Sequence, residues 1–146
     1  MSIESNKATV RRFYELTNAG NLASINTLFD PRAVFHLPGS PSPIDIKTYI
    51  EQYEDFLKAF PDGKETIDDL IAEGDYVVAR TTFRGTNRGA APMMGITSAT
   101  GKQVVLPSVA ICRLVDGKIV ERWDEYDTLN MMVQLGIVKA PQIAAR

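Results

Sequence analysis

The Asp116-Gly117 dipeptide constrains the fold of this sequence most strongly, because it separates two runs of alternating apolar and polar residues. An Asp-Gly pair between such runs predicts a β-hairpin with a type I′ turn, in which both central residues take positive φ. We therefore predict strands over residues 104–115 and 118–126, with Val115 opposite Lys118. A short amphipathic helix is expected to follow, ending at Gly136.

Residues of the second strand alternate between the two faces of the predicted sheet. If the pairing continues from the turn without interruption, Ala110 lies opposite Trp123 and Cys112 lies opposite Glu121. One face then carries Ile119, Glu121, Trp123 and Glu125. The other face carries Lys118, Val120, Arg122, Asp124 and Tyr126. A β-bulge would exchange the two faces beyond it, because one extra residue reverses the alternation.

The sequence predicts helices in its N-terminal half and strands afterwards. Helical spacing of apolar residues is found over residues 4–18, 22–29 and 45–60, and strands are expected at 33–37, 64–72 and 76–84. Gly85–Gly101 forms a long loop, of a length that is more often functional or mobile than inert. This order predicts a single α+β domain over residues 1–146, with a curved antiparallel sheet, helices packed on its concave face, and a pocket between them.

Composition and charge exclude several classes of function. The chain is 45% hydrophobic and 23% charged with a net charge of −2, so it is typical of a globular protein, and it lacks the basic stripe of a nucleic-acid-binding protein. No stretch approaches 18 apolar residues, so we expect no membrane span. The single Cys112 excludes an intrachain disulfide and fits a reducing, cytoplasmic compartment. One histidine and one cysteine argue against a catalytic metal.

Three segments carry a family resemblance: VVARTTFRGTNRG, MMGITSATGKQV and ICRLVDGKIVERWDEYDTLNMMVQLG. The elements GT-x-x-G, G-x-x-x-TGK, DGKI-x-E-x-W-D and QLG occur in this order, and together they resemble the SnoaL-like polyketide cyclase family of the NTF2-like superfamily. The resemblance implies a cone-shaped α+β barrel, a homodimer, and a cofactor-free site inside the cone. Family members with known activity close a ring by intramolecular aldol condensation, with an acidic residue as general acid/base. The sequence departs from the family at Asn87, where members often carry histidine, and this weakens the expectation of a polar role there.

Three carboxylates near the end of the last strand are candidates for the general acid/base. Glu125 would enter the pocket beside Trp123 if their face is concave. The limonene-epoxide hydrolases of the superfamily also place a catalytic acid two residues after a tryptophan. The alternative is that Glu125 is a strand-end glutamate bonded to Ser108. Asp124 would reach the pocket only after a bulge, and would otherwise be an exposed salt-bridge partner. Asp127 fits the family pattern W-x-x-x-D, but its place before the last helix also predicts an N-cap.

Two basic residues are candidates for stabilising an enolate oxygen. Arg80 is the expected partner of Glu121, and it could instead polarise a substrate carbonyl. His36, the only histidine, could serve the pocket or could simply pack on a half-buried strand. Neither alternative is decided by the sequence.

The remaining candidates would bind the apolar part of a substrate. They are Trp123, Tyr14, Tyr53, Phe56 and Met94. Aromatic residues at helical spacing also fit a plain hydrophobic core. Met93 and Met94 could form a flexible lid or a dimer contact.

Three functions remain open at this point. The first is a cofactor-independent SnoaL-like cyclase or isomerase acting on a hydrophobic, carbonyl-rich small molecule. In it, Glu125 or Asp124 removes an α-proton, and His36 or Arg80 stabilises the enolate oxygen. The second is hydrolysis of an epoxide or ester, which a cleft with two facing carboxylates and a cation would favour. The third is a non-catalytic module that binds a ligand or protein, which a filled cone with paired or exposed acids would favour.

Overall fold

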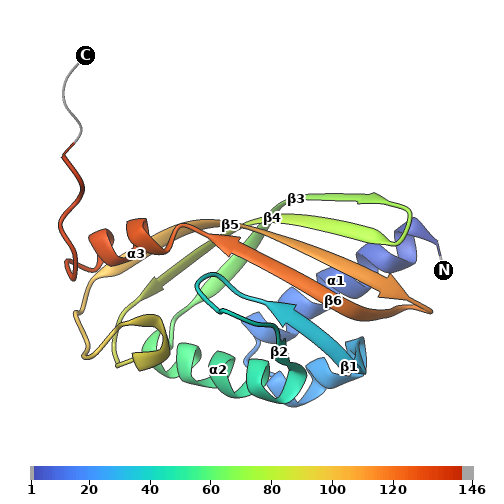
Figure 1. Cartoon of the computed structure of the whole chain (residues 1–146), viewed down its shortest axis with the longest axis horizontal. Coiled ribbons are helices and arrows are strands. Elements are labelled where there is room, and N and C mark those ends of the chain that lie inside the picture. Colours follow the sequence, from blue (N-terminus) through green and yellow to red (C-terminus); the bar gives the residue numbers. More distant parts are fainter. Residues whose placement is uncertain (1, 143–146) are drawn as a thin grey trace.

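The computed structural model describes residues 2–142, and it has the helices-then-strands order that the sequence predicts (Figure 1). The elements are α1 (Ile3–Asn18), η1 (Leu22–Leu28), β1 (Phe29–His36), β2 (Ile44–Asp45), α2 (Ile46–Ala59), β3 (Lys64–Glu73), β4 (Tyr76–Thr86), η2 (Pro92–Met94), β5 (Gln103–Val115), β6 (Lys118–Tyr126) and α3 (Thr128–Gln134). The strands form one curved sheet in the order β2-β1-β6-β5-β4-β3. All neighbouring strands are antiparallel except β1 and β6, which run parallel. The predicted α+β fold is confirmed.

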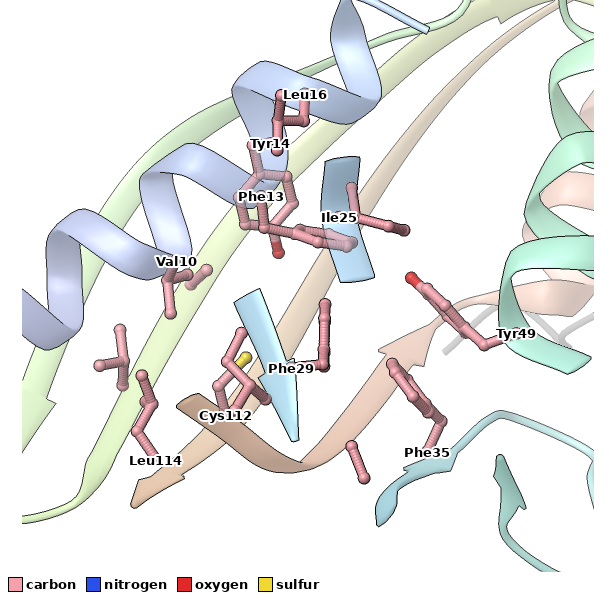
Figure 2. Packing of buried hydrophobic residues seen from close by; sticks show 14 of the residues in the cluster. Val10, Phe13, Tyr14, Leu16, Ile25, Phe29, Phe35, Tyr49, Cys112 and Leu114 are labelled. Atoms are coloured by element: carbon pink, nitrogen blue, oxygen red, sulfur yellow. The ribbon is translucent and has the colours of Figure 1, made fainter. Parts of the chain in front are cut away.

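The helices α1 and α2 pack on the concave face of the sheet, α1 against β3 and β4 and α2 against β1 (Figure 1). Aromatic residues of α1, β1 and α2 form the centre of the larger core cluster, with Phe35 and Tyr49 stacked at 4.1 Å between ring centroids (Figure 2). A second cluster surrounds Phe60, Phe83 and Met131 near α3. The apolar faces of the amphipathic helices therefore bury against the sheet as their periodicity predicts.

Helix starts agree with the capping residues in the sequence. The Asp45 side chain accepts a hydrogen bond from Thr48 N at 2.8 Å, so the helix predicted over 45–60 begins at Ile46. The Asp127 side chain accepts one from Asn130 N at 2.8 Å, which confirms the predicted N-cap of the last helix. Such caps each stabilise a helix by about 1 kcal/mol.

The first strand is longer than expected. It begins at Phe29 rather than Ala33, because the predicted second helix is a 3₁₀ helix that ends at Leu28. Pro31 lies inside this strand, where the pairing of β1 with β6 changes register between Phe29 and Val34. A proline lacks the N–H that a regular ladder needs, so it is tolerated at this interruption.

The hairpin turn has the predicted conformation, with φ of 49° at Asp116 and 77° at Gly117. Val115 pairs with Lys118 and Leu114 with Ile119, as expected. The register then shifts, so that Arg113 pairs with Glu121 and Val120 is an extra residue in β6.

The register predicted beyond Val120 is therefore wrong by one residue. Ile111, not Ala110, lies opposite Trp123, and Cys112 lies opposite Arg122 rather than Glu121. As a result the two faces of β6 are exchanged: Arg122, Asp124 and Tyr126 face the concave side, and Glu121, Trp123 and Glu125 face outward.

The loop after β4 is fastened by Asn87, which is fully buried. Its Nδ2 donates to the Gly89 carbonyl at 2.8 Å, and its Oδ1 accepts from Thr100 N at 2.7 Å. These bonds join the two ends of the loop that carries η2. The polar role of Asn87 is thus to hold the loop.

Candidate functional site

A cavity of about 510 Å³ lies between α2, the concave face of the sheet and two loops. Its apolar wall is built by Phe56, Phe83, Met94, Leu106 and Met131. Its polar wall is built by Glu65, Ser108, Arg122, Asp124 and Tyr126. Residues 37–41 and 91–94 also line it. A volume of this size suits a small molecule with a few rings.

The polar wall is centred on an ion pair between Arg122 and Asp124. Arg122 Nε lies 3.1 Å from both Asp124 Oδ1 and Oδ2, and Nη2 lies 2.9 Å from Oδ1. Their side chains are 3% and 15% exposed, so the pair is shielded from water. The alternation of β6 brings the two side chains together, because residues two apart lie on the same face of a strand.

Aromatic residues of α1 surround the buried guanidinium. The Arg122 Cζ lies 4.3 Å from the centroid of the Phe13 ring, and Nη2 donates to the Tyr14 hydroxyl at 3.2 Å. Burial lowers the pKa of Arg122, but the Asp124 carboxylate beside it raises that pKa, and the net change is a rise. Arg122 is therefore a permanent cation, held by the carboxylate and by cation–π contacts.

Glu65 of β3 supplies a second carboxyl group to the cavity. Its Oε1 accepts a hydrogen bond from Thr81 Oγ1 at 2.6 Å and a longer one from Ser108 Oγ at 3.3 Å. Burial raises the pKa of Glu65, against the opposing effect of the Thr81 hydrogen bond. Glu65 thus holds its proton more tightly than an exposed glutamate does.

The site has the composition that a reaction through proton transfer needs. One carboxylate is paired with a cation, burial raises the pKa of a second carboxyl group, and both groups border apolar surface. Two titratable groups whose environments differ in this way can divide the roles of base and acid.

A family model described as SnoaL-like polyketide cyclase matches residues 7–135. The chain belongs to the SnoaL-like polyketide cyclase family. Among curated protein sequences, none matches the chain.

Several solved structures are similar to this SnoaL-like chain over most of its length. IdmH from Streptomyces antibioticus, a proposed polyketide cyclase, is 31% identical with a TM-score of 0.77, covering 90% of this chain and 98% of its own. AclR from Streptomyces galilaeus, a proposed hydroxylase, is 28% identical with a TM-score of 0.83, covering 97% of this chain and 87% of its own. TsrD from Streptomyces laurentii is 25% identical with a TM-score of 0.81, covering 94% of this chain and 99% of its own.

The SnoaL-like cavity contains several of the residues predicted to bind substrate. Tyr53, Phe56 and Met94 line it. Tyr14 lies behind Arg122 as its hydrogen-bond partner and is almost fully buried. Asp124 reaches the cavity by the bulge that the sequence left as an alternative.

His36, Glu121 and Trp123 lie on the outer face of the sheet. His36 stacks on Trp123 at 5.1 Å between ring centroids, and His36 Nε2 lies 2.8 Å from Glu121 Oε1. Glu121 also contacts Arg113, not Arg80. The expectations that Trp123 shapes the cavity and that Glu121 pairs with Arg80 are wrong, because the bulge turns residues 121, 123 and 125 away from the helices.

Arg80 and Glu125 also lie outside the cavity. The Arg80 Nη2 lies 2.6 Å from Asp69 Oδ2 on the outer face, and its side chain is 56% exposed. Glu125 is exposed, and Tyr126 rather than Glu125 lies opposite Ser108. The Asp127 carboxylate is engaged at the start of α3.

Glu65 and Arg122 were not recognised as site residues from the sequence. A weak signal for Glu65 is its position in phase with Ile67 on the predicted strand, which places an acid among inward-facing residues. Arg122 depends on the bulge, which no sequence pattern marks. Both residues can be assigned to the cavity only once the bulge and the packing of the helices against the sheet are known.

Within residues 2–142, no group of three or more His, Cys, Asp or Glu side chains could hold a metal ion. No helix in the described part of the chain is long and apolar enough to cross a membrane.

Proposed function

We propose that this protein is a cofactor-independent cyclase that uses Asp124 as general base on a hydrophobic small molecule with several carbonyl groups. The observation that carries the proposal is the shielded Arg122–Asp124 pair in the wall of a largely apolar cavity. Membership of the SnoaL-like family supports the reaction class, as does the similarity to IdmH, a proposed polyketide cyclase.

The proposed reaction begins with removal of a proton from the carbon next to a substrate carbonyl. The Asp124 carboxylate accepts this proton, and the electron pair of the C–H bond forms an enolate. Arg122 stays bonded to Asp124 and places a positive charge beside the developing anion. The enolate carbon then attacks a second carbonyl carbon of the same molecule, which closes a ring.

The apolar wall would hold the substrate in a folded conformation. Tyr53, Phe56, Phe83 and Met94 offer aromatic and polarizable surface to a ring system. Holding the two reacting carbons together lowers the entropic barrier to ring closure. Met93 and Met94 belong to the loop that forms one wall of the cavity, so they would contact the same substrate.

The proposal is tested by exchange of α-protons for deuterium in naphthylacetone, an apolar ketone with exchangeable α-protons. We expect the wild-type protein to accelerate exchange, and Asp124→Asn to lower the enzymatic rate by about 100-fold or more. Glu125→Gln is the matched control, because it alters the neighbouring carboxylate on the opposite face. If wild type and Asp124→Asn accelerated exchange at the same rate, Asp124 would not be the general base.

Hydrolysis of an epoxide is a second candidate, favoured by one specific observation. The cavity contains two carboxyl groups, Glu65 and Asp124, together with the cation of Arg122. In this case Asp124 would orient a water molecule while an acid protonates the epoxide oxygen. Incorporation of heavy oxygen from labelled water into a naphthyl epoxide, without any α-proton exchange of the ketone, would favour hydrolysis over cyclisation.

A role as a non-catalytic binding module is less well supported. A simple binding cavity has no need for the buried ion pair, nor for Glu65, whose carboxyl is held by two hydroxyl groups rather than by a cation. If the protein catalysed neither α-proton exchange nor epoxide hydrolysis but bound the ketone tightly, the role as a binding module would be favoured.

We further propose that the protein is a homodimer in the cytoplasm. The outer face of the sheet carries exposed apolar side chains that a second copy could cover, including Tyr76, Val105 and Val109. Buried, unpaired Cys112 fits a reducing compartment. Sedimentation analysis of the wild type and of Val109→Glu tests the dimer, since the charge should shift the equilibrium toward monomers.

A further inference from the structure

Glu65 stands in the cavity wall with one carboxyl oxygen held and the other available. Both of its side-chain hydrogen bonds within the described residues fall on Oε1, from Thr81 and Ser108. Thr81 is fully buried, and its Oγ1 lies 2.7 Å from Ser108 Oγ, so the two hydroxyl groups form a fixed support. The support leaves Oε2 for a ligand in the cavity.

The backbone around Glu65 is also fixed. Asn18 of α1 donates from Nδ2 to the Glu65 carbonyl at 2.8 Å, and its Oδ1 accepts from Glu65 N at 2.8 Å. This pair of bonds fastens the start of β3 to the end of α1. A carboxyl group with both backbone and side chain held loses little entropy when it contacts a substrate.

We propose that Glu65 is a second catalytic residue, which donates its carboxyl proton from Oε2 to the oxygen of the carbonyl group attacked during ring closure. This inference rests on the proposed function and divides its proton transfers between two residues. The rise in the pKa of Glu65 caused by burial favours the protonated form that the step requires.

The atoms and electrons of the step balance without another reactant. The enolate carbon forms a C–C bond to the second carbonyl carbon, and the C=O π electrons move to its oxygen. That oxygen takes the proton of Glu65, which leaves a hydroxyl group on the product and a carboxylate on Glu65. Asp124 now holds the α-proton, and transfer of one proton from Asp124 to Glu65 through water restores the starting state.

The outer face of the same two strands offers a matched control. Asp68 Oδ2 accepts a hydrogen bond from Thr82 Oγ1 at 2.6 Å, the same distance as between Glu65 and Thr81. Asp68 and Thr82 face solvent on the far side of the sheet from the cavity. Asp68→Asn therefore removes a carboxyl group held by a similar hydrogen bond without touching the site.

The test uses a naphthyl-substituted 1,5-diketone, which can both exchange its α-protons and close to a six-membered ring. We expect Glu65→Gln to slow ring closure by about 30-fold or more and to leave α-proton exchange within about threefold of wild type. Glu65→Asp, which retains an acid, should recover part of the closure rate, and Asp68→Asn should match wild type. Asp124→Asn should lose both activities.

The outcomes separate the two proposals. Ring closure at the wild-type rate by Glu65→Gln, with exchange still dependent on Asp124, would overturn the role of Glu65 alone. Absence of exchange by the wild-type protein would overturn the proposed function, and the role of Glu65 with it. Loss of both activities in Glu65→Gln and Glu65→Asp alike would assign Glu65 to the architecture of the cavity and also overturn its role as acid.

Discussion

The two faces of β6 carry the same types of charged residue but place them in different environments. On the concave face, Arg122 and Asp124 form an ion pair that is 3% and 15% exposed. On the outer face, Glu121 contacts His36 and Arg113, and these side chains are 22–35% exposed. A charge pair on the cavity side is strong because water is excluded, whereas the outer network is weakened by solvent.

The same contrast appears in the protonation of two glutamates. Burial raises the pKa of Glu65 in the cavity, whereas the hydrogen bond from His36 lowers the pKa of Glu121 on the outer face. The cavity therefore favours a proton donor, and the outer face favours a fixed negative charge. One extra residue in β6, Val120, decides which side chains belong to each face.

The largest difference between the faces should appear when the concave carboxylate is removed. Asp124→Asn leaves the buried guanidinium of Arg122 without its counter-charge and should lower the free energy of unfolding by about 3 kcal/mol. Glu125→Gln alters the adjacent exposed residue and should change it by less than about 0.5 kcal/mol. Urea unfolding of both variants measures the difference, and equal effects would contradict the assignment of faces.

A gain in stability is expected when Glu65 is neutralised. Since the pKa of Glu65 is raised in the folded state, ionisation destabilises the fold as pH rises above the unfolded value of about 4.3 and through the folded pKa. Glu65→Gln removes this loss and should raise the melting temperature at neutral pH, with a smaller gain at pH values near 4. Thermal melts across this pH range that show the gain only in acid would reverse the sign we assign.

The outer glutamate should behave in the opposite way. The pKa of Glu121 is lowered in the folded state, so its contribution is present above the unfolded value of about 4.3 and is lost as pH falls through the folded pKa. Glu121→Gln should cost about 0.5 kcal/mol at neutral pH and nothing in strong acid. The matched melts of Glu65→Gln and Glu121→Gln should therefore diverge as pH rises.

The smallest effect is expected at Arg80. Its contacts with Asp69 and Asp68 lie on the exposed outer face. Arg80→Gln should leave ring closure and α-proton exchange unchanged, and its melting temperature should match wild type within error. A loss of α-proton exchange in this variant would instead support the role in the site that the sequence suggested for Arg80.

Local patterns in the sequence were sufficient for the turn, the helix starts and the fold class. Asp116-Gly117 requires positive φ, and Asp45 and Asp127 cap helices through bonds to residues three positions later. Each of these interactions is short in sequence, so the residues themselves determine it.

The candidate site depended on contacts that are distant in sequence. Strand β6 pairs with β5 on one side and with β1 on the other. The bulge at Val120 shifts the register with β5, and the register of β1 against β6 changes between Phe29 and Val34. It allows Arg122 to meet Phe13 and Tyr14 of α1, more than 100 residues away. Strand alternation alone therefore predicted that Glu125 faces the cavity, whereas in the folded structure Asp124 faces it.

The most direct measurement of this division between the faces is a crystal structure with naphthylacetone bound. We expect the naphthyl ring beside Phe56, Phe83 and Met94, with the ketone oxygen within hydrogen-bonding distance of the Glu65 carboxyl group and the α-carbon next to the Asp124 carboxylate. A ligand bound on the outer face beside Trp123 and His36, with the cavity unoccupied, would contradict the assignment of the site to the concave face.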